Sequence, residues 1–477
     1  MVIDGKKRER IWTYFEEISS IPHGSGNMGP ITQYCKSFAE AHQLECIQDE
    51  IGNILIRKPA TEGYEDCPGI VLQGHLDMVC VAEAGKEIDF EKEGIAVRTD
   101  GIKVWADGTS LGADDGIAVA YALAVLEADD IPHPHLEALF TVDEEVGLLG
   151  AAAFDPSTLK GTRLINIDSE EEGFLTVSCA GGARALATLP LESQPAEGKA
   201  FKVILEKLLG GHSGMEIHKG RINSIQLLGR ILNNLSAMVD FQVSSLAGGV
   251  KENAIPSDGQ AVILTKEPEK FMDAFMEYHA VLEQELRKLE PKCKIRLEEC
   301  DMPAMMYTEE STKKAIFCIY HCLSGMQRMS AEFDGLVQTS LNAGILFSDE
   351  SSVSIRYSIR SSVSTEKEEL KNKVADFHKF LGGTIEFMAE YPAWEYKEYS
   401  PLRDLAAKAY EELYEEKPEI IAIHAGLECG IFAGKRGDLD CISFGPTLKN
   451  VHSPKETADI ASVERTWQLL LNILREK

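Results

Sequence analysis

The segment Val71-Leu72-Gln73-Gly74-His75-Leu76-Asp77-Met78-Val79 gives the clearest indication of both the fold and the chemistry. It is apolar and strand-like, with a histidine and a carboxylate at alternate positions. Because side chains alternate along a strand with a period of two, His75 and Asp77 are expected to point to the same side. A metal-binding imidazole commonly has its other ring nitrogen held by a carboxylate, so the pair suits a metal site. A simple hydrogen-bonded pair is the alternative interpretation of this segment alone.

The residues on either side of this segment alternate between helical and strand-like patterns. Helices are expected at 30–41 and 115–128, and strands at 51–57, 137–142 and 163–167. Apolar strands that alternate with helices indicate an α/β sheet covered on both faces. Ligands of such sheets gather at the carboxyl ends of the strands.

The pattern changes after this first part of the chain. Strands are expected at 201–209, 261–265, 294–298, 353–360 and 384–390, and long amphipathic helices at 221–239, 269–289 and 366–381. Residues 184–392 are therefore predicted to form an inserted α+β domain. Residues 393–477 return to the α/β pattern and are predicted to complete the catalytic domain that residues 1–183 begin. The predicted fold is thus a two-domain α/β protein.

Size and composition narrow the classes of protein to consider. A chain of 477 residues suggests two or more domains, and 44% hydrophobic with 26% charged residues is typical of a soluble globular protein. No apolar run approaches the roughly 20 residues that span a bilayer. The charged start leads into an amphipathic helix at 11–18 instead of a secretory signal, so a cytoplasmic location is expected.

Cysteine content and net charge exclude further classes. The eleven cysteines contain no Cys-x-x-Cys pair, which disfavours both a disulfide framework and a cysteine-rich zinc site. A formal charge of −29 repels nucleic acid and anionic membranes, so neither is an expected partner. Solubility is the simplest role for this charge.

Four further segments place acidic or imidazole side chains at the ends of predicted elements. They are 111–117 with Asp114 and Asp115, 140–147 with Glu144 and Glu145, 164–173 with Asp168, and 444–454 with His452. Taken singly, each segment has a simpler interpretation. An aspartate of 111–117 can cap a helix, 140–147 can be an exposed acidic turn, 164–173 can end in a solvated acidic loop, and His452 can be an ordinary loop histidine.

Taken together, these segments indicate a metal centre. His75, Asp114, Glu145, Asp168 and His452 supply two imidazoles and three carboxylates, all close to predicted strand ends or a helix start. Three converging carboxylates without a cation would repel one another, and at least one would stay protonated. Two divalent ions bridged by one carboxylate remove that cost. The ligand mixture suits zinc, with manganese or cobalt as alternatives.

In this order, the motifs resemble those of the M20 metallopeptidases, and within that family the branch of aminoacyl-histidine dipeptidases. Supporting stretches are 52–60, 168–173, 210–214 and 424–430, so the likeness runs over nearly the whole chain. The resemblance implies that Asp114 bridges two zinc ions, with His75 and Asp168 completing one site and Glu145 and His452 the other. It also implies that Asp77 orients the histidine ligand and that Glu144 is the general base.

The resemblance further implies that the inserted domain is a lid that meets the substrate. His212, Asn253 and Arg360 match its substrate-binding residues, and Gly426 matches a substrate-binding glycine. Where many relatives carry a Gly-Gly pair, this chain has His424 and Ala425 before Gly426. A buried structural histidine or a surface arginine is the alternative for the residues of the lid, which aligns less firmly.

The activity implied is metal-assisted hydrolysis of dipeptides, with Xaa-His or broad specificity. The nearest rival is another amidohydrolase with the same metal centre, an N-acyl amino acid deacylase or a carboxypeptidase. A non-catalytic binding protein is disfavoured because Glu144 and all five ligand positions are filled. Family likeness suggests a homodimer. The large insert offers contacts that smaller relatives obtain from a partner subunit, so the alternative is that the lid residues act within one chain.

Overall fold

The computed structural model describes residues 9–477, and the chain divides into two compact units. Unit 1 runs to Cys179 and includes Trp394–Ile423 and Leu427–Lys477, whereas unit 2 comprises Ala180–Ala393 and His424–Gly426. The short segment at 424–426, predicted as part of the catalytic domain, belongs to unit 2. Its contacts explain this, since the amide of Ala180 donates to the carbonyl of Ala425 and Ser340 bonds the ring of His424.

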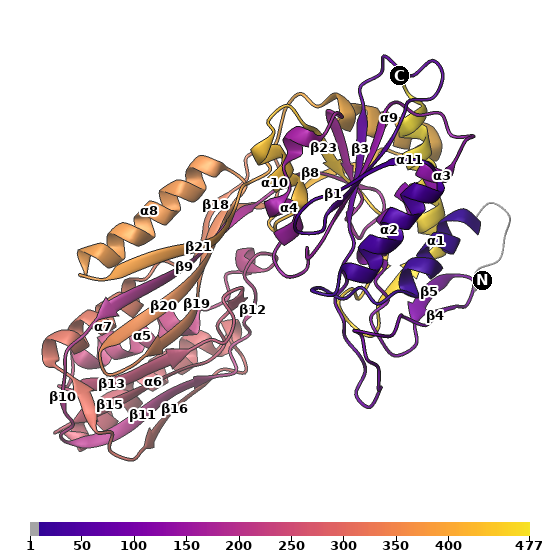
Figure 1. Ribbon diagram of the computed structural model, residues 1–477. Helices are drawn as coiled ribbons and strands as arrows, with labels where there is room; N and C mark the ends of the chain where they lie inside the picture. The colour runs from indigo at the N-terminus through magenta and orange to yellow at the C-terminus, as the bar shows by residue number, and fades with distance from the viewer. Residues whose placement is uncertain (1–8) are drawn as a thin grey trace. The chain divides into compact units, whose positions relative to one another are not determined.

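Unit 1 is built on an eight-stranded sheet (Figure 1). In sheet order its strands are β1 (Glu45–Gln48), β2 (Ile54–Lys58), β6 (Leu136–Thr141), β3 (Ile70–His75), β7 (Arg163–Asn166), β23 (Asp440–Ser443), β8 (Phe174–Cys179) and β22 (Glu419–Ile423). The central four strands, from β6 to β23, run parallel. Strands β3 and β6 are buried throughout and are mostly apolar, and the polar residues within them, Gln73 and Glu137, are buried with hydrogen-bond partners.

Helices lie on both faces of this sheet, with α4 and α10 on one side and α1, α3 and α11 on the other (Figure 1). The helices of unit 1 are α1 (Glu9–Ser19), α2 (Gly29–Ala41), α3 (Ala113–Glu127), α4 (Leu149–Ala153), α9 (Pro401–Tyr414), α10 (Glu428–Lys435) and α11 (Ile460–Arg475). Helix α3 has almost no polar face, because it packs between α1 and β3 and is buried nearly all round. A Cβ at Gly74 would come within 2.7 Å of the Ala118 Cβ, so glycine permits this close packing.

A second, four-stranded sheet in unit 1 supports the loops around the candidate site. Its order is β24 (Leu448–Lys449), β25 (Thr457–Asp459), β5 (Lys103–Ala106) and β4 (Val97–Thr99). Strand β25 therefore joins the segment that contains His452 to the segment that precedes Asp114.

The predicted strand through 71–79 ends earlier than expected. Strand β3 stops at His75, and Asp77 lies in the loop that follows. The chain leaves the sheet here because the amide of Met78 bonds the carbonyl of His23 outside it. The expectation that His75 and Asp77 alternate along one strand is therefore wrong, although the two residues still meet.

Unit 2 contains a nine-stranded antiparallel sheet. In order its strands are β16 (Lys294–Glu299), β11 (Lys199–Glu206), β15 (Gly259–Thr265), β13 (Gln242–Gly248), β19 (Val337–Ser348), β20 (Ser352–Ser361), β9 (Gly181–Pro190) and β21 (Thr384–Tyr391), with β18 (Gly325–Met329) also paired to β19. Helices α5 (Ser224–Ser236), α6 (Pro268–Leu289), α7 (Glu309–His321) and α8 (Ser364–Phe380) pack with it. Two short pairs complete the unit: β10 (Ser193–Pro195) with β17 (Met305–Tyr307), and β12 (Gly211–His212) with β14 (Ala254–Ile255).

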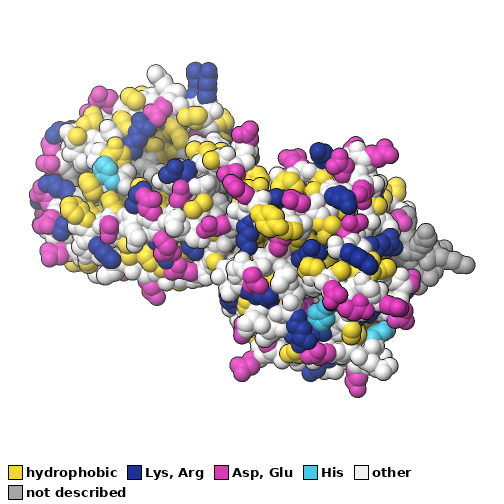
Figure 2. Space-filling view, turned by 90° about the horizontal axis from the view of Figure 1, so that it is seen from above, with side chains coloured by type: hydrophobic (Ala, Val, Ile, Leu, Met, Phe, Trp, Pro, Cys, Tyr) yellow, Lys and Arg dark blue, Asp and Glu magenta, His cyan; other side chains and the backbone are white. Residues whose placement is uncertain are grey.

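The expectations about cysteines, membrane-spanning helices and surface charge can be compared with the structure. All eleven cysteines lie within residues 9–477 and are free thiols. No helix in that described range is long and apolar enough to cross a membrane. The face shown in Figure 2 carries Asp and Glu side chains interspersed with Lys and Arg, without a continuous basic patch.

Candidate metal centre

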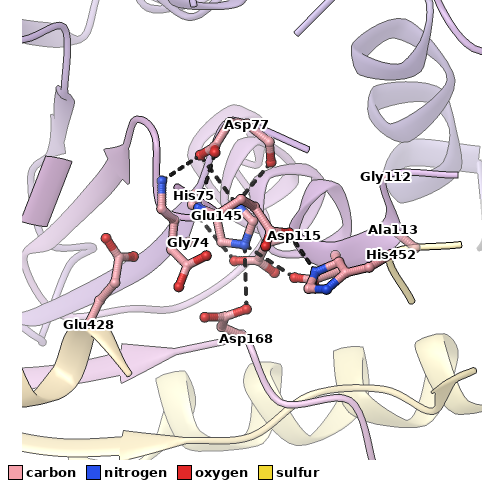
Figure 3. Close-up of polar contacts among 12 residues, drawn as sticks. Gly74, His75, Asp77, Gly112, Ala113, Asp115, Glu145, Asp168, Glu428 and His452 are labelled. Atoms are coloured by element: carbon pink, nitrogen blue, oxygen red, sulfur yellow. Dashed lines mark hydrogen bonds and ion pairs between the residues drawn. The ribbon is translucent and has the colours of Figure 1, made fainter. Parts of the chain in front are cut away.

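The predicted ligands converge at the carboxyl edge of the parallel strands in unit 1. His75 is the last residue of β3, Glu145 follows the end of β6, and Asp168 follows the end of β7. The register pairs His75 with Thr141, so these strands end at the same level. Figure 3 shows the labelled side chains of His75, Glu145, Asp168 and His452 directed toward a common centre.

Asp114 lies between the two histidines. Its Oδ1 is 3.1 Å from Nε2 of His75, and its Oδ2 is 3.2 Å from Nε2 of His452. Asp168 Oδ1 lies 3.6 Å from His75 Nε2, and Glu145 Oε1 lies 2.8 Å from His452 Nε2. The structure thus brings together all five predicted ligands, in two groups that share Asp114.

This donor set fits a pair of divalent cations. Imidazole nitrogens and carboxylate oxygens are the ligands that zinc takes in catalytic sites. Among the described residues, the ligand atoms of two groups lie within 4.8 Å of one another: His75 with Asp114 and Glu145, and His75 with Asp115 and Asp168. Nδ1 of His75 donates to the carbonyl of Asp77 at 2.9 Å, so in the neutral ring the lone pair of Nε2, which faces Asp114, is the one that can bind a cation.

Asp77 lies beside the ring of His75 and makes further contacts that were not predicted. Its Oδ1 is 3.6 Å from Nδ1 of His75, so the backbone carbonyl is the nearer partner of the ring. The carboxylate instead accepts the amides of Glu144 at 2.9 Å and Glu145 at 3.2 Å, and the hydroxyl of Ser25 at 2.8 Å. Burial alone would raise the pKa of Asp77. The interactions with His75 and with these donors outweigh burial, so the pKa lies below its usual value. A charged Asp77 therefore fixes the acidic turn after β6.

Glu144 sits in that turn and is partly buried. Burial, reinforced by the charges of Asp168, Glu428 and Glu145, raises its pKa well above 4.5, against the lowering effect of His75. A carboxylate with a raised pKa is suited to accept and return a proton near neutral pH.

Three further buried acids lie at this site; Asp115 was noted in the sequence without a metal role, and the other two were not identified. Asp115 accepts the amide of His75 at 3.1 Å, so it does not cap α3, whose N-cap is Gly112. Glu428, fully buried, accepts bonds from Gln73 and Thr141, and Glu456 accepts four backbone amides. The position of Glu456, four residues after His452, is a signal that the sequence offered, whereas Asp115 and Glu428 depend on tertiary contacts.

Zinc binding to this cluster is expected to release protons. In the absence of metal, hydrogen bonds with Asp114 and Glu145 raise the pKa of His452 to about 11. Burial lowers the pKa of His75, but bonds to Asp114 and Asp168 raise it well above 6.5. Both rings are then protonated at pH 7, whereas a metal binds neutral imidazole, so zinc affinity should fall as the pH is lowered.

Isothermal titration calorimetry of metal-free protein in buffers of different ionisation enthalpy measures this release. We expect proton release as the site fills at pH 7, from the two histidines and from acids whose pKa is raised without metal, such as Glu144. Zinc binding without proton release would contradict the assignment of both histidines as ligands.

The residues predicted for the lid gather within unit 2. His212 ends β12, beside β14, and the amide of Ser213 donates to the carbonyl of Asn253 at 2.9 Å. Arg360 is half-buried on β20 and its Nη1 bonds the Tyr391 hydroxyl at 3.3 Å. A Cβ at Gly426 would approach the Tyr391 ring to 2.8 Å, so only glycine fits there without a shift.

In this part of unit 2 the charge of Arg360 lies near two neutral histidines, and several buried polar atoms lack a hydrogen-bond partner. Burial, with the charge of Arg360, lowers the pKa of His212 and lowers that of His424 to about 3. Among the described residues, Nε of Arg360, Nδ1 of His424 and Oγ of Ser213 are buried without a hydrogen-bond partner. Such groups are suited to receive an anion.

Comparison with known proteins decides the family. A family model described as "Peptidase family M20/M25/M40" matches residues 71–476. The chain belongs to this peptidase family. The cytosol non-specific dipeptidase of Escherichia coli is 37% identical over 470 residues, which cover 98% of this chain and 97% of that relative.

Solved structures agree with the fold of this M20 peptidase. The aminoacylhistidine dipeptidase from Vibrio alginolyticus is 36% identical, with a TM-score of 0.89 over 98% of this chain and 96% of that one. The aminopeptidase PepT from Bacillus cereus shares only the fold, at 16% identity and a TM-score of 0.59 over 99% of each chain. The predicted two-domain α/β fold is confirmed, and the protein is a hydrolase that acts on peptide bonds.

Proposed function

We propose that this M20 peptidase is a di-zinc dipeptidase, with Xaa-His or broad specificity. The observation that carries the proposal is the position of Asp114, whose two oxygens face two histidines that belong to separate ligand groups. The names of the relatives that share 36–37% identity over nearly the whole chain support dipeptides as substrates.

His75, Asp114 and Asp168 would hold one ion, and Asp114, Glu145 and His452 the other. Two such ions would supply Lewis-acid activation of water and of the scissile carbonyl. Glu144 removes a proton from the attacking water and returns it to the leaving amine. Asp77 keeps Glu144 in place through the amide bond at 2.9 Å.

Unit 2 is proposed to bind the substrate through His212, Asn253, Arg360 and Gly426. The unpaired buried Nε of Arg360 supports a role in binding the terminal carboxylate, for which a guanidinium offers a bidentate fork. His212, with its pKa lowered, stays neutral near pH 7 and acts as a hydrogen-bond partner of the peptide.

Replacing Arg360 should weaken recognition of the carboxyl terminus. Arg360→Ala is expected to raise KM for Ala-His about 10- to 100-fold, the loss of one charged hydrogen-bonded contact, without a change in zinc content. Arg356→Ala is the control, since Arg356 is a partly buried arginine of the same strand that is paired with Glu252. If the variant and wild type discriminate equally between Ala-His and its carboxyl-terminal amide, Arg360 does not bind this group.

A substrate panel tests the proposed function. Zinc-loaded protein is expected to cleave Ala-His and β-Ala-His, both of which carry a free amine, and to leave N-acetyl amino acids intact. Cleavage of N-acetyl amino acids alone would instead assign the same centre to a deacylase. A cytoplasmic location and the homodimer stay predictions, which fractionation and light scattering would test.

A further inference from the structure

Glu456 differs from the other buried acids at the site because its carboxylate accepts four backbone amides. Its side chain is 3% exposed, and both oxygens accept successive backbone amides of the loop that precedes α3. Oε2 accepts from Leu111 at 2.7 Å and Gly112 at 3.1 Å, and Oε1 accepts from Ala113 at 2.9 Å and Asp114 at 3.4 Å.

Four successive amides that converge on one anion form a concave anion-binding loop. The backbone around Gly112 is adapted to it, since Gly112 has φ +70° and a Cβ there would lie 2.9 Å from the Met78 sulfur. The last amide of the set is that of Asp114, so the loop conformation fixes where the shared carboxylate lies.

Glu456 also belongs to the segment that carries the other histidine. Its own amide bonds the carbonyl of Ser453, next to His452, at 3.1 Å. Directly after it, β25 pairs with β5, where Thr457 faces Trp105 and Ala458 faces Val104. The two loops that supply Asp114 and His452 are therefore joined by one buried carboxylate.

We propose that Glu456 is a positioning residue that holds the Asp114 loop in its metal-binding conformation before any metal arrives. This inference rests on the proposed di-zinc function. The contacts join only residues of unit 1, and they run from backbone amides to Glu456 without using a candidate ligand atom. The loop can therefore be held independently of a cation.

Glu456→Gln tests the proposal with nearly unchanged volume. One acceptor oxygen becomes an NH₂ group that faces two N–H donors, so the loop must shift. We expect zinc affinity, measured by competition with a chelator, to fall about 10- to 100-fold, the usual effect of removing a group that orients a ligand. Turnover should recover at saturating zinc, because Asp114 itself is intact.

Glu137→Gln is a matched control in the same unit. Glu137 is also fully buried and accepts the amides of Lys160 and Gly161, both at 2.7 Å, but it lies near the start of β6, away from the metal centre. Both variants should lower the melting temperature, and only Glu456→Gln should lower zinc affinity. Wild-type zinc affinity in folded Glu456→Gln, or an equal loss in Glu137→Gln, would overturn the proposal.

Amide hydrogen exchange of the wild-type protein tests the same proposal without a variant, because it measures how firmly the loop amides are bonded. In metal-free protein the amides of residues 111–114 are expected to exchange slowly, and fast exchange there would overturn the proposal. If wild-type protein binds no zinc, the proposed function fails, and this exchange measurement still judges the role of Glu456.

Discussion

Glu144→Gln is expected to lower kcat for Ala-His about 10²- to 10⁴-fold, the typical contribution of a general base. The amide side chain cannot accept the proton of water, yet it has nearly the same shape as the carboxyl. The backbone of residue 144 stays bonded to Asp77, so the neighbouring Glu145 should keep its position. Zinc content should therefore remain that of the wild type.

Stopped assays of Ala-His hydrolysis, combined with metal analysis of the same samples, measure both quantities. Glu171→Gln is the control, because Glu171 is an exposed acid in the loop after β7. Wild-type turnover in Glu144→Gln would show that another group accepts the proton.

Asp114→Ala is expected to abolish activity through loss of metal. Its carboxylate has one oxygen toward each histidine, at 3.1 and 3.2 Å, so its removal takes a ligand from both proposed sites. The remaining imidazoles and carboxylates still attract cations, but each site would keep only two protein ligands. We expect less than one zinc per chain to survive dialysis.

Elemental analysis after dialysis against metal-free buffer measures this loss. Asp107→Ala is the control, since Asp107 is exposed and lies in the same segment of the chain. Retention of two zinc ions by Asp114→Ala would rule out a bridging role for this carboxylate.

The helices and central strands were predictable because hydrophobic periodicity sets them locally. The buried strands β3 and β6 are mostly apolar, and α2 and α3 fall where the pattern placed them. The convergence of His75, Glu145 and Asp168 was predictable for a related reason: each lies at or soon after the end of a strand, and parallel strands bring such ends to one edge.

The end of β3 and the contacts of Asp77 were not predictable from periodicity. Tertiary hydrogen bonds decide both, since the amide of Met78 bonds the carbonyl of His23 and the carboxylate of Asp77 accepts the amides of Glu144 and Glu145. Glu428 and Glu456 were missed because their partners lie hundreds of residues earlier in the chain. In the same way, the segment at 424–426 joins unit 2 through contacts that no local pattern encodes.

The central claim is that two divalent ions share Asp114. Anomalous scattering at the zinc edge, from crystals of zinc-loaded protein, tests it most directly. We predict two peaks flanking the Asp114 carboxylate, one also bound by His75 and Asp168 and the other by Glu145 and His452. A single peak, or zinc bound away from Asp114, would contradict the claim.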